Sequence, residues 1–372
     1  MFRVPKYNYQ DQLPGLDEEI LPALRRILLS GTYVLGPEVA EFEANLAAFL
    51  EARYAVGVNS GTDALILGLD ALGIGPGDRV VTVANSFHAT AQAIVRRGAR
   101  PVLVDCRDTD YLIDLDQVPA VLDPAARALI IVHLFGQAVD VTAAKDLCDR
   151  SGLLLVEDCA QAIGARSRGV RVGSVSDAGC WSFAPAKNLA AAGDGGAVST
   201  PRADVDRQLR LLRHFGQPEQ NRHEIVGYNS RLDTLQACLL NVKIKRLDAW
   251  NAARVRAAAG YRARLAGLPL TFQAGAGPDE HVYHLFQVRA QSRAVRDGLV
   301  KVLREGGVDA VVRYPTPLHL QPAFADLGYR RGAFPVAEAL AEQTLCLPIR
   351  PDLTADDADH VCGLIAEYFG KS

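Results

Sequence analysis

Between about residues 53 and 200 the sequence repeats one pattern, in which a short apolar run is followed by an Ala-rich stretch with helical spacing. The runs are rich in Val, Ile and Leu, which is typical of parallel strands buried on both faces by covering helices. Helices are predicted over 62–72 and 141–151. Seven strands are predicted in one sheet, formed by YAVGV, RVVTVA, RPVLVDC, ALIIVHLF, LLLVEDC, AGCWSF and GGAVST.

The pattern changes after Arg231. One long stretch follows, with apolar residues at Leu235, Leu239, Val242 and Ile244, and it predicts a helix that links two domains. Beyond it, strand-like and helix-like segments indicate a small α+β unit. The expected fold is therefore α/β. A three-layer α/β/α large domain with a mostly parallel seven-stranded sheet would occupy residues 1–246, and a smaller C-terminal α+β domain would occupy residues 247–372.

Composition and charge exclude several classes of function. The net charge of -3 and the scattered arginines give no basic surface for nucleic acid. The apolar runs are far too short to cross a bilayer, and the N-terminal residues lack a signal-peptide core, so a cytoplasmic protein without a membrane partner is expected. The seven cysteines form no C-x-x-C pair, and His281 and His284 are three residues apart in a predicted strand. Neither a disulfide framework nor a metal site is therefore expected.

Candidate ligand-binding residues follow the predicted strands, because ligands of open parallel sheets bind beyond the carboxyl ends of the strands. Ser60-Gly61-Thr62 opens a helix and suits a phosphate, although a plain helix cap uses the same residues. Phe87 can stack on a flat ring or simply pack on the core. Burying the Asp158 carboxylate beside five apolar residues costs free energy unless a cation pairs with it. Gln161 follows one helical turn later. Ser182 adds a hydroxyl at the same edge.

Lys187 is the unusual residue of the stretch CWSFAPAKNLAAAGDGGAV (180–198), where Asp194 is the one other charge. Most lysines are solvated surface residues. However, lysines make up only seven of the forty basic residues of this chain, which indicates chemistry that arginine cannot perform, because a guanidinium does not release its proton. Apolar neighbours are expected to lower the pKa of Lys187 towards neutrality, which suits Schiff-base formation.

Together these residues fit one cofactor. Lys187 can condense with an aldehyde, Asp158 can keep a pyridine nitrogen protonated, Phe87 can cover the ring, and the Ser60-Gly61-Thr62 helix start with Ser182 can hold a phosphate. The sequence therefore predicts a site for pyridoxal 5′-phosphate.

The sequence also resembles the DegT-type (DegT/DnrJ/StrS) nucleotide-sugar aminotransferases, which have the aspartate-aminotransferase fold, called fold type I among enzymes that use pyridoxal phosphate. The resemblance covers nearly the whole chain. It is carried by SGTYVLGPEVAEFE (30–43), NSGTDAL (59–65), GIGPGDRVVTVANSFHATAQAI (73–94), VHLFGQ (132–137), VEDCAQAIGA (156–165), SFAPAKNLAAAGDGGAV (182–198), GYNSRLDTLQA (227–237) and YPTPLHLQPAF (314–324).

The resemblance implies a role for each cofactor-site residue. Lys187 would bind the cofactor covalently, Asp158 would face the pyridine nitrogen, and Gln161 would lie near the ring hydroxyl. Asn229 would reach the phosphate of the neighbouring subunit's cofactor, which implies a homodimer with shared active sites. The phosphate contacts implied within one chain are Gly61, Thr62 and Ser182.

The same resemblance implies amino transfer from L-glutamate to a keto sugar attached to a nucleotide diphosphate. Family members that act as dehydratases have histidine at the position of Lys187, so the lysine favours amino transfer. VHLFGQ, GYNSRLD and WNAAR look most like members acting on 3-keto sugars, which indicates a 3-amino product linked to dTDP or UDP. Tyr33, Arg231 and His319 lie in motifs around the family's sugar pocket, and each is equally compatible with ordinary packing.

Three alternatives are compatible with the sequence. One is transfer to a 4-keto sugar, and another is a non-catalytic regulator that binds the cofactor. The third is a cysteine desulfurase or a lyase of the same fold. A desulfurase would need a reactive cysteine on a mobile loop. Ala190, Ala192 and His88 depart from the residues usual in the family and bear on the shape of the pocket.

Overall fold

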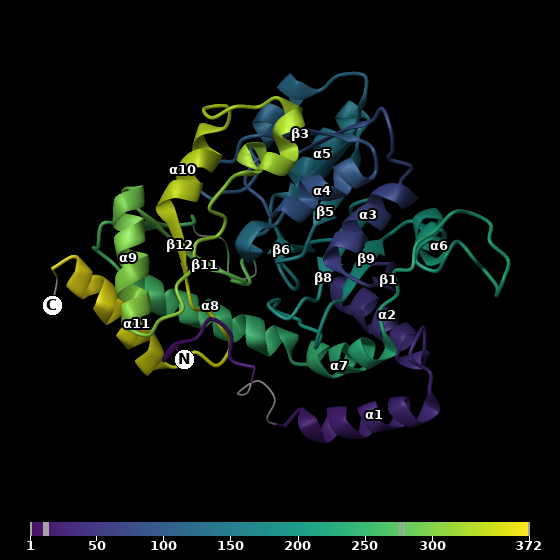
Figure 1. The fold of residues 1–372 in the computed structure, drawn as a ribbon, viewed down its shortest axis with the longest axis horizontal. Coiled ribbons are helices and arrows are strands. Elements are labelled where there is room, and N and C mark those ends of the chain that lie inside the picture. The colour runs from purple at the N-terminus through teal and green to yellow at the C-terminus, as the bar shows by residue number, and fades with distance from the viewer. Residues whose placement is uncertain (1, 10–14, 275–276, 278–279, 371–372) are drawn as a thin grey trace.

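A computed structural model describes residues 2–9, 15–274, 277 and 280–370 of the chain. Its large sheet has the strand order β1-β9-β8-β5-β4-β2-β3 (Figure 1). All seven predicted strands are confirmed. Strand β9 runs antiparallel to β1 and β8, and the remaining pairs are parallel. The strands are β1 (Tyr54–Val58), β2 (Arg79–Val83), β3 (Arg100–Val104), β4 (Ala126–Val132), β5 (Leu154–Asp158), β8 (Ala178–Ser182) and β9 (Gly196–Thr200).

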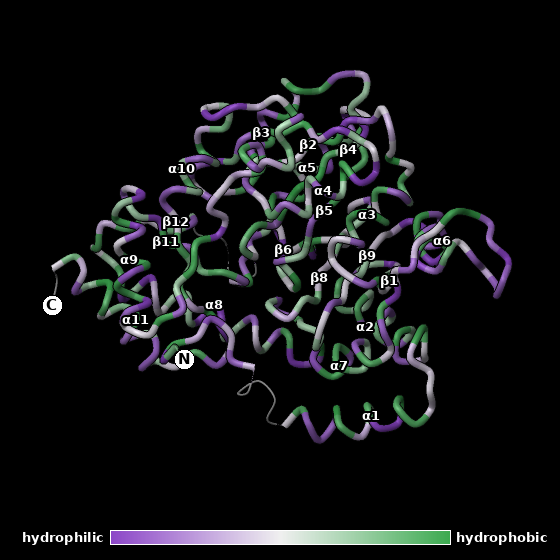
Figure 2. Tube along the Cα trace, in the orientation of Figure 1, coloured by the Kyte–Doolittle hydropathy of each residue, from purple (hydrophilic) through white to green (hydrophobic). Residues whose placement is uncertain are grey.

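Helices cover both faces of this sheet, because successive side chains of each strand point to opposite faces and both sets are apolar. Val80 packs into one core with the helices of the first face, and Val81 packs into the other core. Figure 2 shows hydrophobic segments in green through the centre of the sheet. The first face carries α3 (Gly61–Ala71), α4 (His88–Arg96) and α6 (Ala203–Leu212), and the second carries α2 (Pro37–Leu50), α5 (Val141–Ser151) and α7 (Thr234–Ile244). The three-layer prediction is thus confirmed.

Two predicted helices have local reasons to begin and end where they do. Helix α5 matches the prediction. It starts at the Asp140 cap, whose side chain accepts a hydrogen bond from the N–H of Ala143, and it ends at Gly152 with φ 68°. Helix α3 begins one residue earlier than predicted, because Ser60 is its cap and accepts a hydrogen bond from the N–H of Asp63 at 3.1 Å.

The long linking helix is interrupted, contrary to the prediction. Helix α7 ends at Ile244, and α8 (Leu247–Arg264) follows after two residues. The two helices bury different surfaces, since Leu240 of α7 packs on the large sheet, whereas Tyr261 of α8 packs in the core of the C-terminal sheet. Periodicity alone does not reveal this change of partner, because both helices carry apolar residues at helical spacing.

A second, three-stranded sheet forms the C-terminal core. Its strands are β10 (Leu270–Phe272), β11 (Phe286–Ala290) and β12 (Thr344–Leu347), and they are antiparallel. Helices α8, α9 (Arg293–Glu305) and α11 (Ala355–Tyr368) pack on it. Residues Phe324, Phe334 and Leu340 instead pack on the large sheet's core. The C-terminal part therefore reaches back over the large sheet.

The segment HVYHLFQVRA is a strand only from Phe286 onward, so the predicted strand begins too early. Tyr283 has φ 45°, which turns the chain between His281 and His284 before the strand starts. His284 consequently points into the central cavity, where it is among the lining residues.

Helix α1 (Asp17–Ser30) lies at the lower edge of the molecule beside α7 (Figure 1). Ala23 and Ile27 of α1 pack against Cys238 of α7. Among the described residues, no helix is both long and apolar enough to cross a membrane. The remaining elements are the hairpin β6 (Arg166–Ser167) and β7 (Val170–Arg171), the 3-10 helices η1 (Leu115–Val121), η2 (Leu134–Gly136), η3 (Leu318–Leu320) and η4 (Pro322–Leu327), and α10 (Pro335–Gln343).

Candidate active site

A cavity of about 460 Å³ opens at the carboxyl ends of the large sheet's strands. Its floor comes from the residues that follow β1, β2, β5 and β8, as expected for an open parallel sheet. The structure brings together the sequence-predicted residues Gly61, Thr62, Phe87, Asp158, Gln161, Ser182 and Lys187, all of which line this one cavity.

Lys187 lies in the loop after β8 and lines the cavity. Its backbone N–H donates to the carbonyl of Ala184 at 2.9 Å, so a tight turn holds the backbone at this position. Burial lowers the pKa of Lys187 to about 8, and the attraction of Asp158 offsets only part of that effect. The predicted lowering of the pKa is confirmed. An amine with this pKa is largely available as a nucleophile in mildly alkaline solution.

Asp158, at the end of β5, is buried beneath the same cavity. Its Oδ2 accepts a hydrogen bond from the Thr90 hydroxyl at 2.8 Å, and its Oδ1 accepts one from the N–H of Ala160 at 3.2 Å. Burial raises the pKa of this carboxyl, whereas the two hydrogen bonds and Lys187 act in the opposite direction. A cationic ring nitrogen placed beside the carboxylate would stabilise its ionised form against the cost of burial.

The N-terminus of α3 and the end of β8 form a narrow cradle. The first N–H groups of a helix have no partner within the helix and attract anions. Gly61 permits the close approach, because a Cβ at this position would lie 2.5 Å from the Cβ of Ser182. A Cβ on Gly196 would likewise meet the carbonyl oxygen of Ser60 at 2.3 Å. These contacts bring the Thr62 and Ser182 hydroxyls to the cavity that the helix N-terminus faces.

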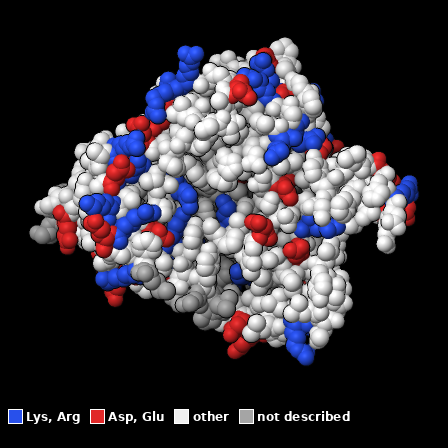
Figure 3. All heavy atoms as spheres, viewed as in Figure 1, with Lys and Arg blue, Asp and Glu red and all other residues white. Residues whose placement is uncertain are grey.

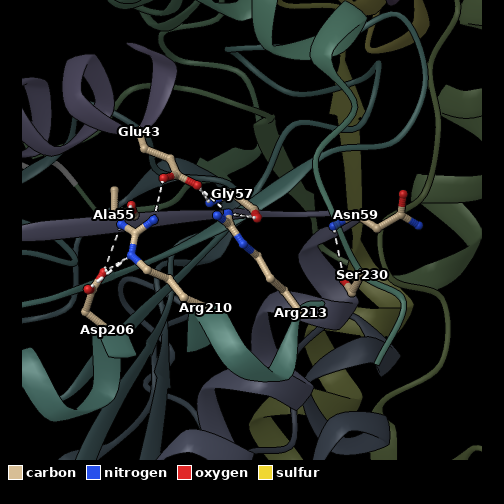
Figure 4. A network of polar contacts seen from close by, with 8 residues as sticks. All are labelled: Glu43, Ala55, Gly57, Asn59, Asp206, Arg210, Arg213 and Ser230. Carbon is tan, nitrogen blue, oxygen red and sulfur yellow. Dashed lines mark hydrogen bonds and ion pairs between the residues drawn. The ribbon is translucent and has the colours of Figure 1, made fainter. Parts of the chain in front are cut away.

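A buried polar network fixes strand β1 and the start of α3 behind this cradle (Figure 4). Glu43 accepts hydrogen bonds from the N–H of Gly57 at 2.9 Å and from the guanidinium groups of Arg210 and Arg213. Figure 4 shows Arg210 of α6 and Arg213, directly after that helix, both reaching this carboxylate. Because each charge has an opposite partner, the network holds the edge strand without leaving a buried charge unpaired.

Ser230 connects the same region to the cradle. Its hydroxyl donates to Asp63 in the first turn of α3 at 2.7 Å and accepts a hydrogen bond from the N–H of Asn59 at 3.2 Å. Ser230 therefore ties the first turn of α3 to the residue that follows β1.

Phe87 and Gln161 both lie on the wall of the cavity. The Phe87 ring is 44% exposed on the cavity wall and lies 5.6 Å from the ring of Tyr314, centre to centre. Gln161 donates to the Tyr314 hydroxyl at 3.0 Å and accepts a hydrogen bond from the N–H of Phe135 at 2.7 Å. The His88 ring packs edge-on against that of Phe87 and so braces it.

Four predicted residues lie outside the cavity of a single chain. Tyr33 and Asn229 are exposed. Arg231 contacts His214 at 3.1 Å instead of the cavity. His319 is buried, with its Nε2 2.8 Å from Glu338. Their contacts with a substrate or with a neighbouring cofactor therefore stay predictions.

Several cavity residues were absent from the sequence-based set, namely Lys6, Tyr7, Asp194, His284, Arg313 and Tyr314. Arg313 and Tyr314 could have been found, since they follow the strand-like segment VDAVV. The scarcity of lysine that singled out Lys187 applies equally to Lys6, but no sequence pattern connects the N-terminus to the sheet edge.

The alanines that follow Lys187 belong to a loop held through its backbone. The carbonyl of Ala190 accepts a hydrogen bond from Lys243 at 2.7 Å, and the N–H of Ala192 donates to Gln236 at 2.8 Å. Both partners come from α7. Because backbone groups make these contacts, the loop is anchored independently of the side chains of Ala190 and Ala192.

The sequence profile described as the DegT/DnrJ/EryC1/StrS aminotransferase family matches residues 14–366. The chain belongs to this family. It is 43% identical over 98% of its length to the dTDP-3-amino-3,4,6-trideoxy-alpha-D-glucose transaminase of Streptomyces venezuelae, 96% of which is covered. It is also 45% identical over 96% of its length to the erythromycin biosynthesis sensory transduction protein EryC1 of Saccharopolyspora erythraea, 97% of which is covered.

A solved structure shows the same fold. The crystal structure of S. venezuelae DesV in complex with a ketimine intermediate has a TM-score of 0.96 and 42% identity, with all of both chains covered. This agreement confirms the fold-type-I prediction over the full length of the chain.

The site fits pyridoxal 5′-phosphate, the cofactor of this aminotransferase family. The buried Asp158 carboxylate has no ion-pair partner among the described residues, so a pyridinium nitrogen would complete it. Because Gly61 has no Cβ, the start of α3 can approach Ser182 closely, and the two together would suit a phosphate. Lys187 supplies an amine whose lowered pKa suits an aldehyde. The residues present therefore suit the ring nitrogen, the phosphate and the aldehyde of the cofactor.

Proposed function

We propose that this enzyme transfers an amino group from L-glutamate to the 3-keto group of a dTDP- or UDP-linked sugar. The observation that carries the proposal is that Lys187 and Asp158 line one cavity together with the cradle at Gly61 and Ser182. Similarity to a transaminase named for a dTDP-3-amino sugar supports the choice of carbon.

Each residue has a distinct task in this reaction. Pyridoxal 5′-phosphate, when bound, supplies an aldehyde and an electron-withdrawing ring. Asp158 would hold the ring nitrogen in its protonated form, and the cradle would hold the phosphate. Phe87 would cover one ring face. Lys187 Nζ, once displaced by the amino donor, would take the proton from the substrate's Cα as a general base, for which a pKa of about 8 is well placed.

We further propose that the enzyme acts as a homodimer in the cytoplasm. Asn229, Arg231 and Tyr33 lie outside a single chain's cavity, which is compatible with contributions to a neighbour's site. All seven cysteines are unpaired and buried, as suits a reducing compartment.

The first test is spectroscopic and enzymatic. Purified protein incubated with pyridoxal phosphate should show the absorbance of a lysine-bound cofactor, which glutamate should bleach and Lys187→Ala should abolish. A panel of 3-keto and 4-keto nucleotide sugars should then restore the band, with the 3-keto sugars being consumed. Consumption of 4-keto sugars alone would overturn the assignment of the carbon.

A regulatory role is the second candidate, because one close relative is named a sensory transduction protein. A measurement of turnover distinguishes the two candidate functions. An enzyme converts glutamate to 2-oxoglutarate repeatedly when a keto sugar is present, whereas a non-catalytic regulator would bind the cofactor without any turnover.

A further inference from the structure

The N-terminal segment, residues 2–9, is fixed to both sides of the cavity. Val4 pairs with Val308 of the C-terminal part, and the two backbones exchange hydrogen bonds through neighbouring residues. Five residues later, the Tyr9 hydroxyl donates to the carbonyl of Pro185 at 3.1 Å, in the loop that carries Lys187. The intervening residues therefore run along the cavity wall in a defined position.

Lys6 lies in this stretch and is only 5% exposed, yet it lines the cavity. Its backbone N–H donates to Asp309 at 3.3 Å. Its ammonium lies 5.0 Å from the centre of the Tyr7 ring and has neither a hydrogen bond nor an ion pair with any described residue. A buried ammonium without an anion is unfavourable. Burial accordingly lowers the pKa of Lys6, and Arg313 acts in the same direction, whereas Cys346 and Asp309 offset part of the effect.

Arg313 lines the same cavity, and within the described residues its guanidinium has no carboxylate partner. Both Lys6 and Arg313 are close enough to Lys187 to lower its pKa by repulsion. Figure 3 shows basic side chains in blue in the hollow at the middle of the molecule. The described lining also holds two carboxylates, Asp158 and Asp194. Neither forms an ion pair with Lys6 or Arg313, so these two cations can bind an anion that arrives from outside.

We propose that Lys6 and Arg313 together bind a carboxylate of a substrate while the reacting carbon of that substrate lies at Lys187. The inference rests on the proposed amino transfer. The expected source is the amino donor, because its amino group must reach the position of the Lys187 amine and its α-carboxylate is attached to the same carbon. A carboxylate on the keto sugar would be recognised by the same chemistry. The phosphate cradle at Gly61 and Ser182 is a separate anion site of the cavity.

The test uses Lys6→Met and Arg313→Met, which remove one charge each with little change in length. Lys6→Arg keeps the charge, and Lys145→Met is the matched control, because Lys145 is paired with Asp149 away from the cavity. Rapid-mixing absorbance measures the glutamate half-reaction and the keto-sugar half-reaction separately. We expect each Met variant to lower kcat/KM for glutamate about 10- to 100-fold, as for the loss of a charged hydrogen bond. Lys6→Arg should retain most of the rate, and Lys145→Met all of it.

A second readout does not depend on turnover. Calorimetric titration with glutarate, a dicarboxylate that lacks an amine, should show a similarly weakened affinity in the Met variants, with melting temperatures near that of wild type. A loss confined to the glutamate half-reaction supports the donor as the source, and a loss confined to the sugar half-reaction supports a sugar carboxylate. Unchanged rates and unchanged glutarate affinity would overturn the assignment of Lys6 and Arg313 to carboxylate binding. If wild type does not react with glutamate at all, the proposed function fails instead, and the glutarate titration still tests the pair.

Discussion

Burial pushes the two central side chains of the cavity towards their neutral forms. It lowers the pKa of Lys187 and raises that of Asp158, and each offsets part of the effect on the other. The lysine benefits, because only its neutral amine attacks an aldehyde. For the aspartate, hydrogen bonds from Thr90 and Ala160 favour the charged form that a pyridinium nitrogen needs.

The rate at which cofactor-free enzyme captures pyridoxal phosphate should therefore depend on pH with a midpoint near 8. Below the pKa of about 8 the Lys187 ammonium is not nucleophilic, and above it the rate reaches a plateau. Stopped-flow absorbance between pH 6 and 10, at roughly constant ionic strength, measures this profile. A rate that still climbs steadily at pH 10 would mean an ordinary lysine and contradict the assignment.

At this scale the sequence is informative about residues that follow strands. Gly61, Phe87, Asp158 and Ser182 could be found because the end of a buried run marks the sheet edge. Lys6 could not be found in this way. It reaches the cavity only because its segment pairs with Val308 more than 300 residues later, and no local pattern encodes that contact.

Helices and strands were predictable where the same surroundings bury them along their whole length. The seven strands are covered on both faces and therefore appear as continuous apolar runs. The stretch from α7 to α8 was not, because its apolar residues serve two different cores. The early start assigned to β11 has a related cause, since His281 and Tyr283 are largely buried without being in a strand.

The junction of α3 with β8 gives a prediction for the cradle. Gly61→Ala places a Cβ 2.5 Å from that of Ser182 and must open the junction, so affinity for pyridoxal phosphate should fall about tenfold or more. Equilibrium titration of cofactor-free protein measures this affinity. Gly363→Ala is the control, because its Cβ would meet nothing within 4 Å in helix α11, and it should keep cofactor affinity while stabilising the fold by about 0.5–1 kcal/mol. Equal affinity in the two variants would show that the cradle tolerates a side chain.

At the scale of the whole molecule, the edge formed by α1 exposes several large apolar side chains to solvent. Leu21, Leu28 and Leu29 of α1 are 57–71% exposed, while the opposite side of the same helix packs on α7. Tyr33 and Val34 continue this surface and are also exposed. Together with the position of Asn229 outside its own cavity, this edge is the best candidate for contact with a second copy of the chain.

Replacing Leu28 and Leu29 by Asp should therefore convert the enzyme to a monomer and weaken its hold on the cofactor. The substitution puts two charges where a partner must exclude water, and the loss of the partner removes the Asn229 that we expect at the cofactor phosphate. Light scattering should show half the wild-type mass, and absorbance titration should show weaker pyridoxal phosphate binding. Val95→Asp, which adds a charge at an exposed position of α4, should change neither property. A doubly substituted protein that keeps the wild-type mass and affinity would place the contact between copies elsewhere, and a monomeric wild type with full activity would mean that one chain's cavity is sufficient for the reaction.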